Sequence, residues 1–204
     1  MKFYTLEEGK KLVKAARNSI ELFLSTPNFK YSIIENTLPE FTQRHGVFVT
    51  LYIYQTHELR GCIGFIEGIE PINRLLPQAA ISAATEDPRF NPVSKDELDE
   101  LIVEVSILSE PTKLSGNPND LIRQIKIGRD GLIINYGYSS GLLLPIVAVE
   151  EKWGPKEFLD NVCIKAGLPS YMWRMPGVSL SRFSTQVFRE KEPKGEVEEV
   201  KLET

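Results

Sequence analysis

Residues 46–65 read GVFVTLYIYQTHELRGCIGF, and this stretch decides the fold. Aliphatic residues alternate with other residues on both sides of a short central segment, which is the pattern of two β-strands joined by a tight turn. The shortest hairpin loop pairs Tyr54 with Glu58, and the register then brings Tyr52 opposite Arg60. We therefore predict an antiparallel hairpin in which one face carries the aliphatic rows and the other face carries aromatic and polar side chains.

Helices are predicted on both sides of this hairpin. Thr5 and Glu8 form a capping-box pattern at the start of an amphipathic segment that ends before Pro27. Pro71 begins an alanine-rich helix that continues to about Glu86. Further helical segments are predicted after Ser94, from Asn117 and from Gly154 to Gly167.

Strands dominate the remaining pattern. Residues 101–108 and 179–189 alternate like strands, and residues 128–131 (GRDG) have the composition of a hairpin turn between two strands. Because hairpins outnumber helical crossovers, we predict an α+β fold with a largely antiparallel sheet flanked by helices. No linker divides residues 1–189, and residues 190–204 have no core-forming pattern, so we expect the latter to form a mobile C-terminal tail.

Composition limits the class of protein. The chain has 204 residues, of which 42% are hydrophobic and 25% are charged, as is typical of globular proteins. The net charge of −4 disfavours nucleic acid as a partner, and no apolar run reaches the roughly 20 residues of a membrane span. Two widely separated cysteines are no disulfide framework, and the charged N-terminus does not have the pattern of a signal peptide. We therefore expect a cytoplasmic protein.

Cys62 is the sharpest candidate for chemistry. It lies two residues after Arg60 on the same predicted strand, so the two side chains share a face. A nearby guanidinium lowers the pKa of a thiol, and Gly61 and Gly64 leave room for a ligand, which together would suit a catalytic thiol. The alternative is structural: Cys62 fills a small space under the alanine-rich helix, and the glycines serve helix-on-sheet packing.

Four charged residues are further candidates for ligand binding. Arg60 suits a bidentate contact to a carboxylate or phosphate, or alternatively stacks on Tyr52 and pairs with Glu104. Asp87 and Arg89 lie on a loop stiffened by prolines, where they either contact a ligand or form an ion pair that locks the loop; we favour the lock. Glu104 is expected to be a half-buried carboxylate with a basic partner, and general-base catalysis is the minor alternative.

Other familiar sites find no support in the sequence. Cys62, Cys163, His45 and His57 lack the short spacing of zinc ligands, so no metal is expected. There is no Gly-x-Ser-x-Gly elbow and no phosphate-binding Gly-x-x-x-x-Gly-Lys loop. Cys163 lies among apolar residues of a predicted helix and is interpreted as core. The cofactor, if one is used, is unknown.

Residues 59–64, LRGCIG, resemble the signature of the AMMECR1 family. The resemblance extends in the same order from the first helix to Phe188. Its further blocks are residues 46–51 (GVFVTL), 83–84 (AA), 86–90 (EDPRF), 104–106 (EVS), 128–132 (GRDGL), 140–145 (SGLLLP) and 165–168 (KAGL). One departure is Ile146, where the family usually has Gln, and no role is carried over to that residue.

The resemblance implies an α+β fold with a large and a small lobe and a cleft near the signature. It implies no agreed activity, since members have been suggested to act in transcription, repair or translation. By gene context, some prokaryotic members resemble partners of Memo-like and radical-SAM proteins.

Two main functional hypotheses follow. The first is an enzyme or enzyme subunit that holds a small anionic group on Arg60 and uses Cys62 as a reactive thiol. The second is a non-catalytic interaction module that presents the Leu59–Gly64 face to a protein partner. Nucleic-acid binding is a weaker third option, because it needs a basic stripe that the net charge does not indicate. The glycines beside a charged residue favour the enzyme slightly.

Overall fold

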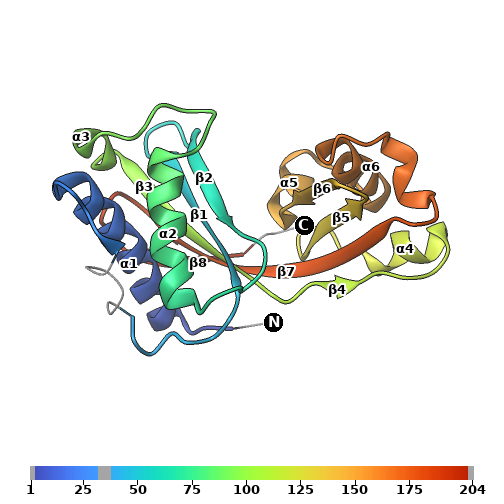
Figure 1. The fold of residues 1–204 in the computed structure, drawn as a ribbon, viewed down its shortest axis with the longest axis horizontal. Helices are drawn as coiled ribbons and strands as arrows, with labels where there is room; N and C mark the ends of the chain where they lie inside the picture. The colour runs from blue at the N-terminus through green and yellow to red at the C-terminus, as the bar shows by residue number, and fades with distance from the viewer. Residues whose placement is uncertain (1–2, 32–37, 202–204) are drawn as a thin grey trace. The chain divides into compact units, whose positions relative to one another are not determined.

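The computed structural model describes residues 3–31 and 38–201. Helices and antiparallel strands are mixed along the chain, which confirms the predicted α+β class (Figure 1). The chain divides into two compact units. Among the described residues, unit 1 contains 3–31, 38–108 and 186–200, and unit 2 contains 109–185 and 201.

The sheet of unit 1 has the strand order β2-β1-β3-β7, and β8 also pairs with β7. Its strands are β1 (Gly46–Ile53), β2 (Leu59–Phe65), β3 (Leu101–Leu108), the last part of β7 (Ser179–Glu190) and β8 (Val197–Val200). β1 is antiparallel to both β2 and β3. The sheet therefore places the signature segment on β2, at the end of the strand order.

Helices α1 (Leu6–Ser25), α2 (Ile72–Thr85) and α3 (Lys95–Leu98) complete unit 1, and α1 and α2 pack with the sheet (Figure 1). The capping box of Thr5 and Glu8 is present at the start of α1, as predicted. A Cβ atom at Gly9 would lie 2.2 Å from the ring of Phe188, so glycine allows α1 to approach β7 closely. Buried aliphatic side chains of both helices and of β1 and β3 form one core.

Unit 2 has its own apolar core. Its elements are β4 (Thr112–Lys113), α4 (Pro118–Gln124), β5 (Asp130–Tyr136), β6 (Ser139–Leu143), α5 (Pro145–Glu150), α6 (Pro155–Lys165), the 3-10 helix η2 (Ser170–Arg174) and the first part of β7. β5 pairs with both β6 and β7 in antiparallel register. Trp173, Phe158 and Cys163 are among the buried core residues.

One predicted hairpin turn in unit 2 is wrong. Residues 125–129 join α4 to β5, Asp130 and Gly131 already belong to β5, and the hairpin lies between β5 and β6, where Gly137 has a φ of 57°. The N–H groups of Arg129 and Asp130 bond to the carbonyl of Lys126, at 3.2 and 2.9 Å, and this fold-back follows a helix instead of a strand. A glycine-rich turn marks a change of direction but does not identify the element that precedes it.

The predicted mobile tail is wrong for residues 190–200, and residues 202–204 lie outside the described residues. β8 pairs with β7, and Val197 packs against the core of unit 1. The N–H of Lys191 bonds to the carbonyl of Glu196 at 2.8 Å, so the segment between the two strands is a turn. Backbone hydrogen bonds between strands do not require many apolar side chains. The composition of this segment was therefore similar to that of a disordered segment.

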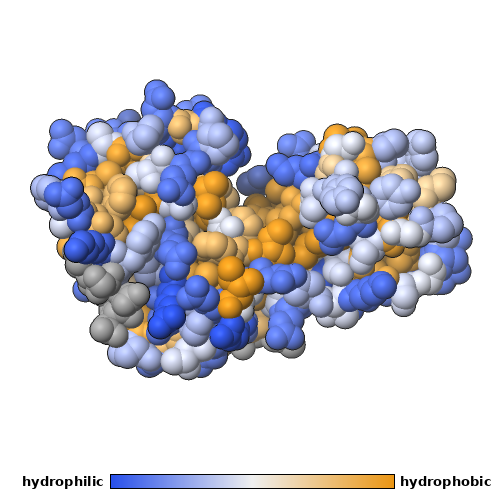
Figure 2. All heavy atoms as spheres, viewed as in Figure 1, coloured by the Kyte–Doolittle hydropathy of each residue, from blue (hydrophilic) through white to orange (hydrophobic). Residues whose placement is uncertain are grey.

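Hydrophilic side chains occupy much of the visible surface of each unit, with apolar side chains between them (Figure 2). Among the described residues, no helix is long and apolar enough to cross a membrane.

Candidate functional site

The signature strand β2 pairs with β1 largely in the predicted register. Thr50 lies opposite Cys62 and Leu51 opposite Gly61, as the sequence predicted. The register then shifts, and Tyr52 pairs with Leu59, so the predicted pairing of Tyr52 with Arg60 is wrong. The turn is longer than the shortest hairpin loop, because the carbonyl of Glu58 already bonds to the N–H of Ile53.

Gly61 and Cys62 point to opposite faces of the sheet, since successive strand residues alternate. A Cβ atom at Gly61 would lie 2.1 Å from the carbonyl oxygen of Ala83, so α2 packs directly on this position. A Cβ atom at Gly64 would lie 2.2 Å from the carbonyl oxygen of Val47. Backbone therefore fills the space that the glycines were predicted to leave for a ligand. Cys62 faces away from α2, so the prediction that it packs under this helix is also wrong.

Arg60 is bonded within unit 1. Its Nε donates to Glu97 Oε1 at 2.5 Å, and its Nη2 donates to Glu97 Oε2 at 3.1 Å and to the carbonyl of Asn91 at 2.9 Å. Its guanidinium also lies over the ring of Phe90 at 5.7 Å. Tyr52 and Glu104 were the expected partners, and the hydrogen bonds of Arg60 go to the loop after α2 and to α3. Arg60 Nη1 is buried and has no hydrogen-bond partner among the described residues.

Asp87 connects the same loop to the signature strand. Its Oδ2 accepts the backbone N–H of Cys62 at 2.8 Å and Nη2 of Arg89 at 2.7 Å, while its Oδ1 accepts Nε of Arg89 at 2.9 Å. The hydrogen bonds from Arg89 are the main cause that lowers the pKa of Asp87 well below its usual value. The predicted ion pair between Asp87 and Arg89, which fixes the loop, is confirmed. Asp87 also accepts a backbone N–H of β2.

Cys62 is half-buried, and its sulfur accepts a hydrogen bond from Thr50 Oγ1 at 3.3 Å. Burial raises the pKa of the Cys62 thiol, and the charges of Glu104 and Asp87 act in the same direction. The hydrogen bond from Thr50 and the charge of Arg89 oppose this shift without reversing it. The expectation that Arg60 lowers this pKa is not supported: the guanidinium that acts on the thiol is that of Arg89, and the net shift of the thiol pKa is upward.

Glu104 belongs to a polar row that crosses three strands. Thr50 of β1 is the register partner of both Cys62 on β2 and Glu104 on β3. Glu104 is buried, and Arg189 Nη1 lies 3.8 Å from its Oε2, which confirms the predicted basic partner. The structure brings six residues together from β2, from the loop after α2 and from α3. We call them the signature cluster: Arg60, Cys62, Asp87, Arg89, Asn91 and Glu97.

A buried ion pair elsewhere in unit 1 was missed by the sequence interpretation. Arg17 Nε and Nη2 donate to the two carboxylate oxygens of Glu190 at 2.6 and 2.5 Å. Glu190 also accepts the N–H of Val103 at 2.8 Å. Arg17 follows Val13 by four residues and precedes Ile20 by three, so helical spacing places it in the buried stripe of α1. That spacing was the signal available in the sequence.

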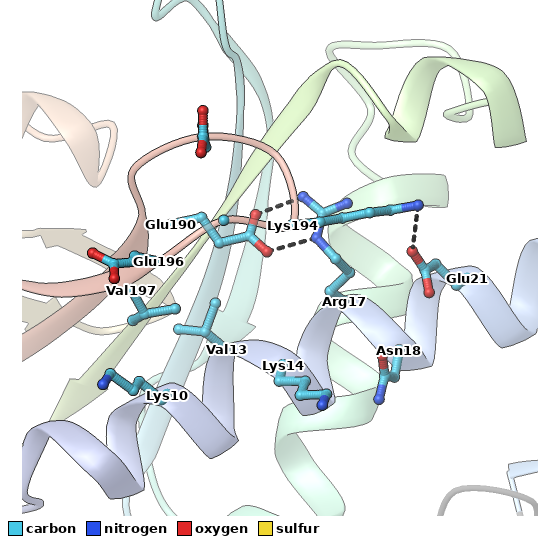
Figure 3. A pocket seen from close by; sticks show the side chains of 12 residues that line it. Lys10, Val13, Lys14, Arg17, Asn18, Glu21, Glu190, Lys194, Glu196 and Val197 are labelled. Carbon is cyan, nitrogen blue, oxygen red and sulfur yellow. Dashed lines mark hydrogen bonds and ion pairs between the residues drawn. The ribbon is translucent and has the colours of Figure 1, made fainter.

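The Arg17–Glu190 pair lies at a hollow of about 730 Å³ between α1 and the turn before β8 (Figure 3). Lys194 crosses this region and binds Glu21 at 3.3 Å and Asp99 at 2.8 Å. Acidic and basic side chains line the hollow in equal number, so it has no net preference for an anion or a cation. Within the described residues, no group of three His, Cys, Asp or Glu side chains is placed to hold a metal ion.

Comparisons with known proteins agree with the signature. The AMMECR1 family model matches residues 13–188. A protein of Methanocaldococcus jannaschii is 50% identical over 99% of this chain and 100% of its own length, and a protein of Methanopyrus kandleri is 47% identical over 96% of this chain and 94% of its own. The crystal structure of an uncharacterized protein from Pyrococcus horikoshii has a TM-score of 0.89 at 43% identity, covering 96% of this chain and 98% of that one. The chain therefore belongs to the AMMECR1 family.

Proposed function

We propose that the protein is a non-catalytic interaction module whose partner docks on the surface around the signature cluster. One observation carries this proposal: the polar side chains that a catalytic site would need are bonded to one another. Arg60 is held by Glu97 and Asn91, and Asp87 is held by Arg89 and the N–H of Cys62. Such a network makes a rigid surface, and a raised thiol pKa leaves little thiolate for nucleophilic attack.

Arg89 is the residue best placed to contact a partner. Its side chain is 53% exposed, and its guanidinium lies over the ring of Phe90 at 5.4 Å. The pair with Asp87 uses Nε and Nη2, so Nη1 remains for an acceptor on a partner. Arginine and aromatic side chains are enriched at the energetic centres of protein interfaces. A carboxylate of a partner protein is therefore the expected contact.

The family resemblance provides the first partners to test, which are Memo-like and radical-SAM proteins of the same genome. Binding would be measured by biolayer interferometry with the full-length chain immobilised. Arg89→Ala is expected to weaken binding by about tenfold or more, the effect of losing a charge-assisted contact at the centre of an interface. Arg74→Ala is the matched control, because Arg74 is 60% exposed on α2 of the same unit.

The proposal fails if Arg89→Ala and Arg74→Ala weaken binding equally while both variants keep the thermal unfolding midpoint of the parent chain. If neither class of partner binds, chemical crosslinking with a reagent that reacts beside Arg89 would identify the occupant. A crosslinked site remote from the signature cluster would also reject the proposal.

An enzyme or enzyme subunit that works at Cys62 is the second candidate. Two observations support it: the row of Cys62, Thr50 and Glu104, and the buried Nη1 of Arg60, which suits a small anionic acceptor. An anion bound on Arg60 would raise the pKa of the Cys62 thiol further, as the charges of Glu104 and Asp87 do. Slower reaction of Cys62 with iodoacetamide in the presence of inorganic phosphate or acetate, without such slowing in Arg60→Gln, would favour the enzyme over the module.

We also propose a cytoplasmic location, and the two free cysteines support it. Nucleic acid remains the least favoured partner, because the net charge is −4.

A further inference from the structure

Unit 2 contains a hollow of its own, with a volume of about 340 Å³. Leu114, Leu121, Trp173 and Leu180 line it and are all buried. These residues come from the end of β4, from α4, from η2 and from β7, so several elements of one core fix the shape of the hollow. Apolar side chains of one core therefore form part of the lining, and the exposed lining is as much polar as apolar.

Arg174 supplies the positive charge in this lining. Its guanidinium stacks on the ring of Trp173 at 4.2 Å, which fixes the orientation of the planar donor group. The nearest carboxylate, Asp160, lies 3.9 Å from Arg174 Nη2, beyond hydrogen-bond distance. Asp160 instead accepts the indole N–H of Trp173 at 2.6 Å and the ammonium of Lys156 at 3.1 Å. The charge of Arg174 is thus only weakly compensated within the protein.

We propose that this hollow binds a small carboxylic acid with an apolar body, held by its carboxylate on Arg174. The apolar side chains of the lining would contact the hydrocarbon or aromatic part of the ligand, and the guanidinium would donate hydrogen bonds to the carboxylate through its fork of N–H groups. A volume of about 340 Å³ is near the lower end for ligand pockets, so the ligand is small. This site lies in unit 2 and is independent of the signature cluster.

The test uses phenylacetate and its neutral analogue phenylacetamide as probes. The chain has two tryptophans, so a ¹⁵N-labelled sample gives two indole N–H signals, and Trp153→Phe assigns them. We expect phenylacetate to shift the Trp173 signal saturably with a Kd of about 1 mM, and phenylacetamide to bind about tenfold more weakly. Arg174→Gln is expected to remove the difference between the two probes.

Two variants make the test specific. Ser115→Phe places a ring at the exposed edge of the hollow and is expected to abolish the shift by both probes. Arg123→Gln removes an exposed arginine of α4 outside the hollow and is expected to bind like the parent chain. Equal binding of the two probes, binding that survives Ser115→Phe, or no saturable shift at about 10 mM would overturn the proposal. The dispersion of the remaining amide signals shows that each variant is folded.

Discussion

Two of the bidentate arginine–carboxylate pairs of unit 1, Arg89–Asp87 and Arg17–Glu190, differ in burial and in the segments they join. Arg89 and Asp87 are two residues apart, and their side chains are 53% and 3% exposed. Arg17 and Glu190 are 173 residues apart, and their side chains are 5% and 4% exposed. The first pair shapes one loop beside the signature strand. The second connects the first helix to the end of β7, although the sequence interpretation gave it no role.

The more buried of the two pairs, Arg17–Glu190, lies outside the signature segment. A buried pair stabilises the fold little relative to an apolar replacement, but removal of one partner leaves an uncompensated charge. A half-exposed pair loses much of its Coulomb energy to solvent. We therefore expect the loss in free energy of unfolding to be larger for variants of the more buried pair, whatever its distance from the signature.

The largest effect is predicted for Glu190→Ala. This change leaves the Arg17 guanidinium buried and the N–H of Val103 without its acceptor, and it should lower the free energy of unfolding by about 3–5 kcal/mol. Glu190→Gln keeps an acceptor oxygen and should have a smaller effect. Urea denaturation followed by circular dichroism measures both. A loss no greater than that of Asp87→Ala would contradict the ranking.

A steric variant of the signature strand comes next. Gly61→Ala would place its Cβ atom 2.1 Å from the carbonyl oxygen of Ala83, so α2 must shift, and a loss of about 1–3 kcal/mol is expected. Gly154→Ala is the control, because its Cβ atom would meet only the flexible end of Glu157. Equal unfolding midpoints in urea for the two variants would show that the close packing at Gly61 is not needed.

Asp87→Asn should change the pH dependence of stability. The folded-state pKa of Asp87 is lowered, mainly by hydrogen bonds from Arg89. Its contribution is therefore complete above the unfolded-state pKa of about 3.9 and is lost as the pH falls toward the folded-state pKa. Neutral Asn should lower the free energy of unfolding near pH 7 by about 1–2 kcal/mol. It should also make the stability depend less on pH in the acidic range. Thermal unfolding from about pH 2 to pH 7 checks this, and parallel curves for the two proteins would refute it.

Lys194→Ala should have the smallest effect. Lys194 bridges Glu21 and Asp99 at the surface, and exposed ion pairs are screened by solvent and salt. We expect the urea midpoint to stay unchanged at about 0.15 M salt. A large loss would mean that this surface bridge, and not the Arg17–Glu190 pair, holds the turn before β8.

The local part of the structure could be predicted from the sequence. The register expected from the shortest hairpin loop correctly placed Cys62 opposite Thr50, and strand alternation correctly put the two side chains on one face. The same argument failed at Tyr52, since the turn contains His57 with a φ of 56° and is longer than the shortest loop. The hydrophobic pattern of a sequence does not reveal which residue will adopt a positive φ.

The long-range part could not be predicted. Glu97, the partner of Arg60, lies 37 residues further along the chain and was not among the expected partners; in the structure it also forms a capping box with Ser94. The segment from residue 190 onward was expected to be mobile because it has no core-forming pattern, but Pro193 and Gly195 belong to the turn that returns the chain to β7. Composition describes a segment alone, whereas an ion pair or a strand pairing depends on what the fold brings beside it.

Hydrogen bonds and ion pairs hold the charged side chains of the signature cluster to one another, and the pKa of its Cys62 thiol is raised. Alkylation of the native protein with iodoacetamide across pH, with Cys62 and Cys163 followed separately by peptide mass spectrometry, tests this most directly. We predict slow labelling of Cys62 with a midpoint above the free-thiol value of about 8.5, raised further by Arg89→Gln and unchanged by Arg60→Gln, while buried Cys163 stays protected. Fast labelling of Cys62 with a midpoint well below that value would contradict the account and favour a catalytic thiol.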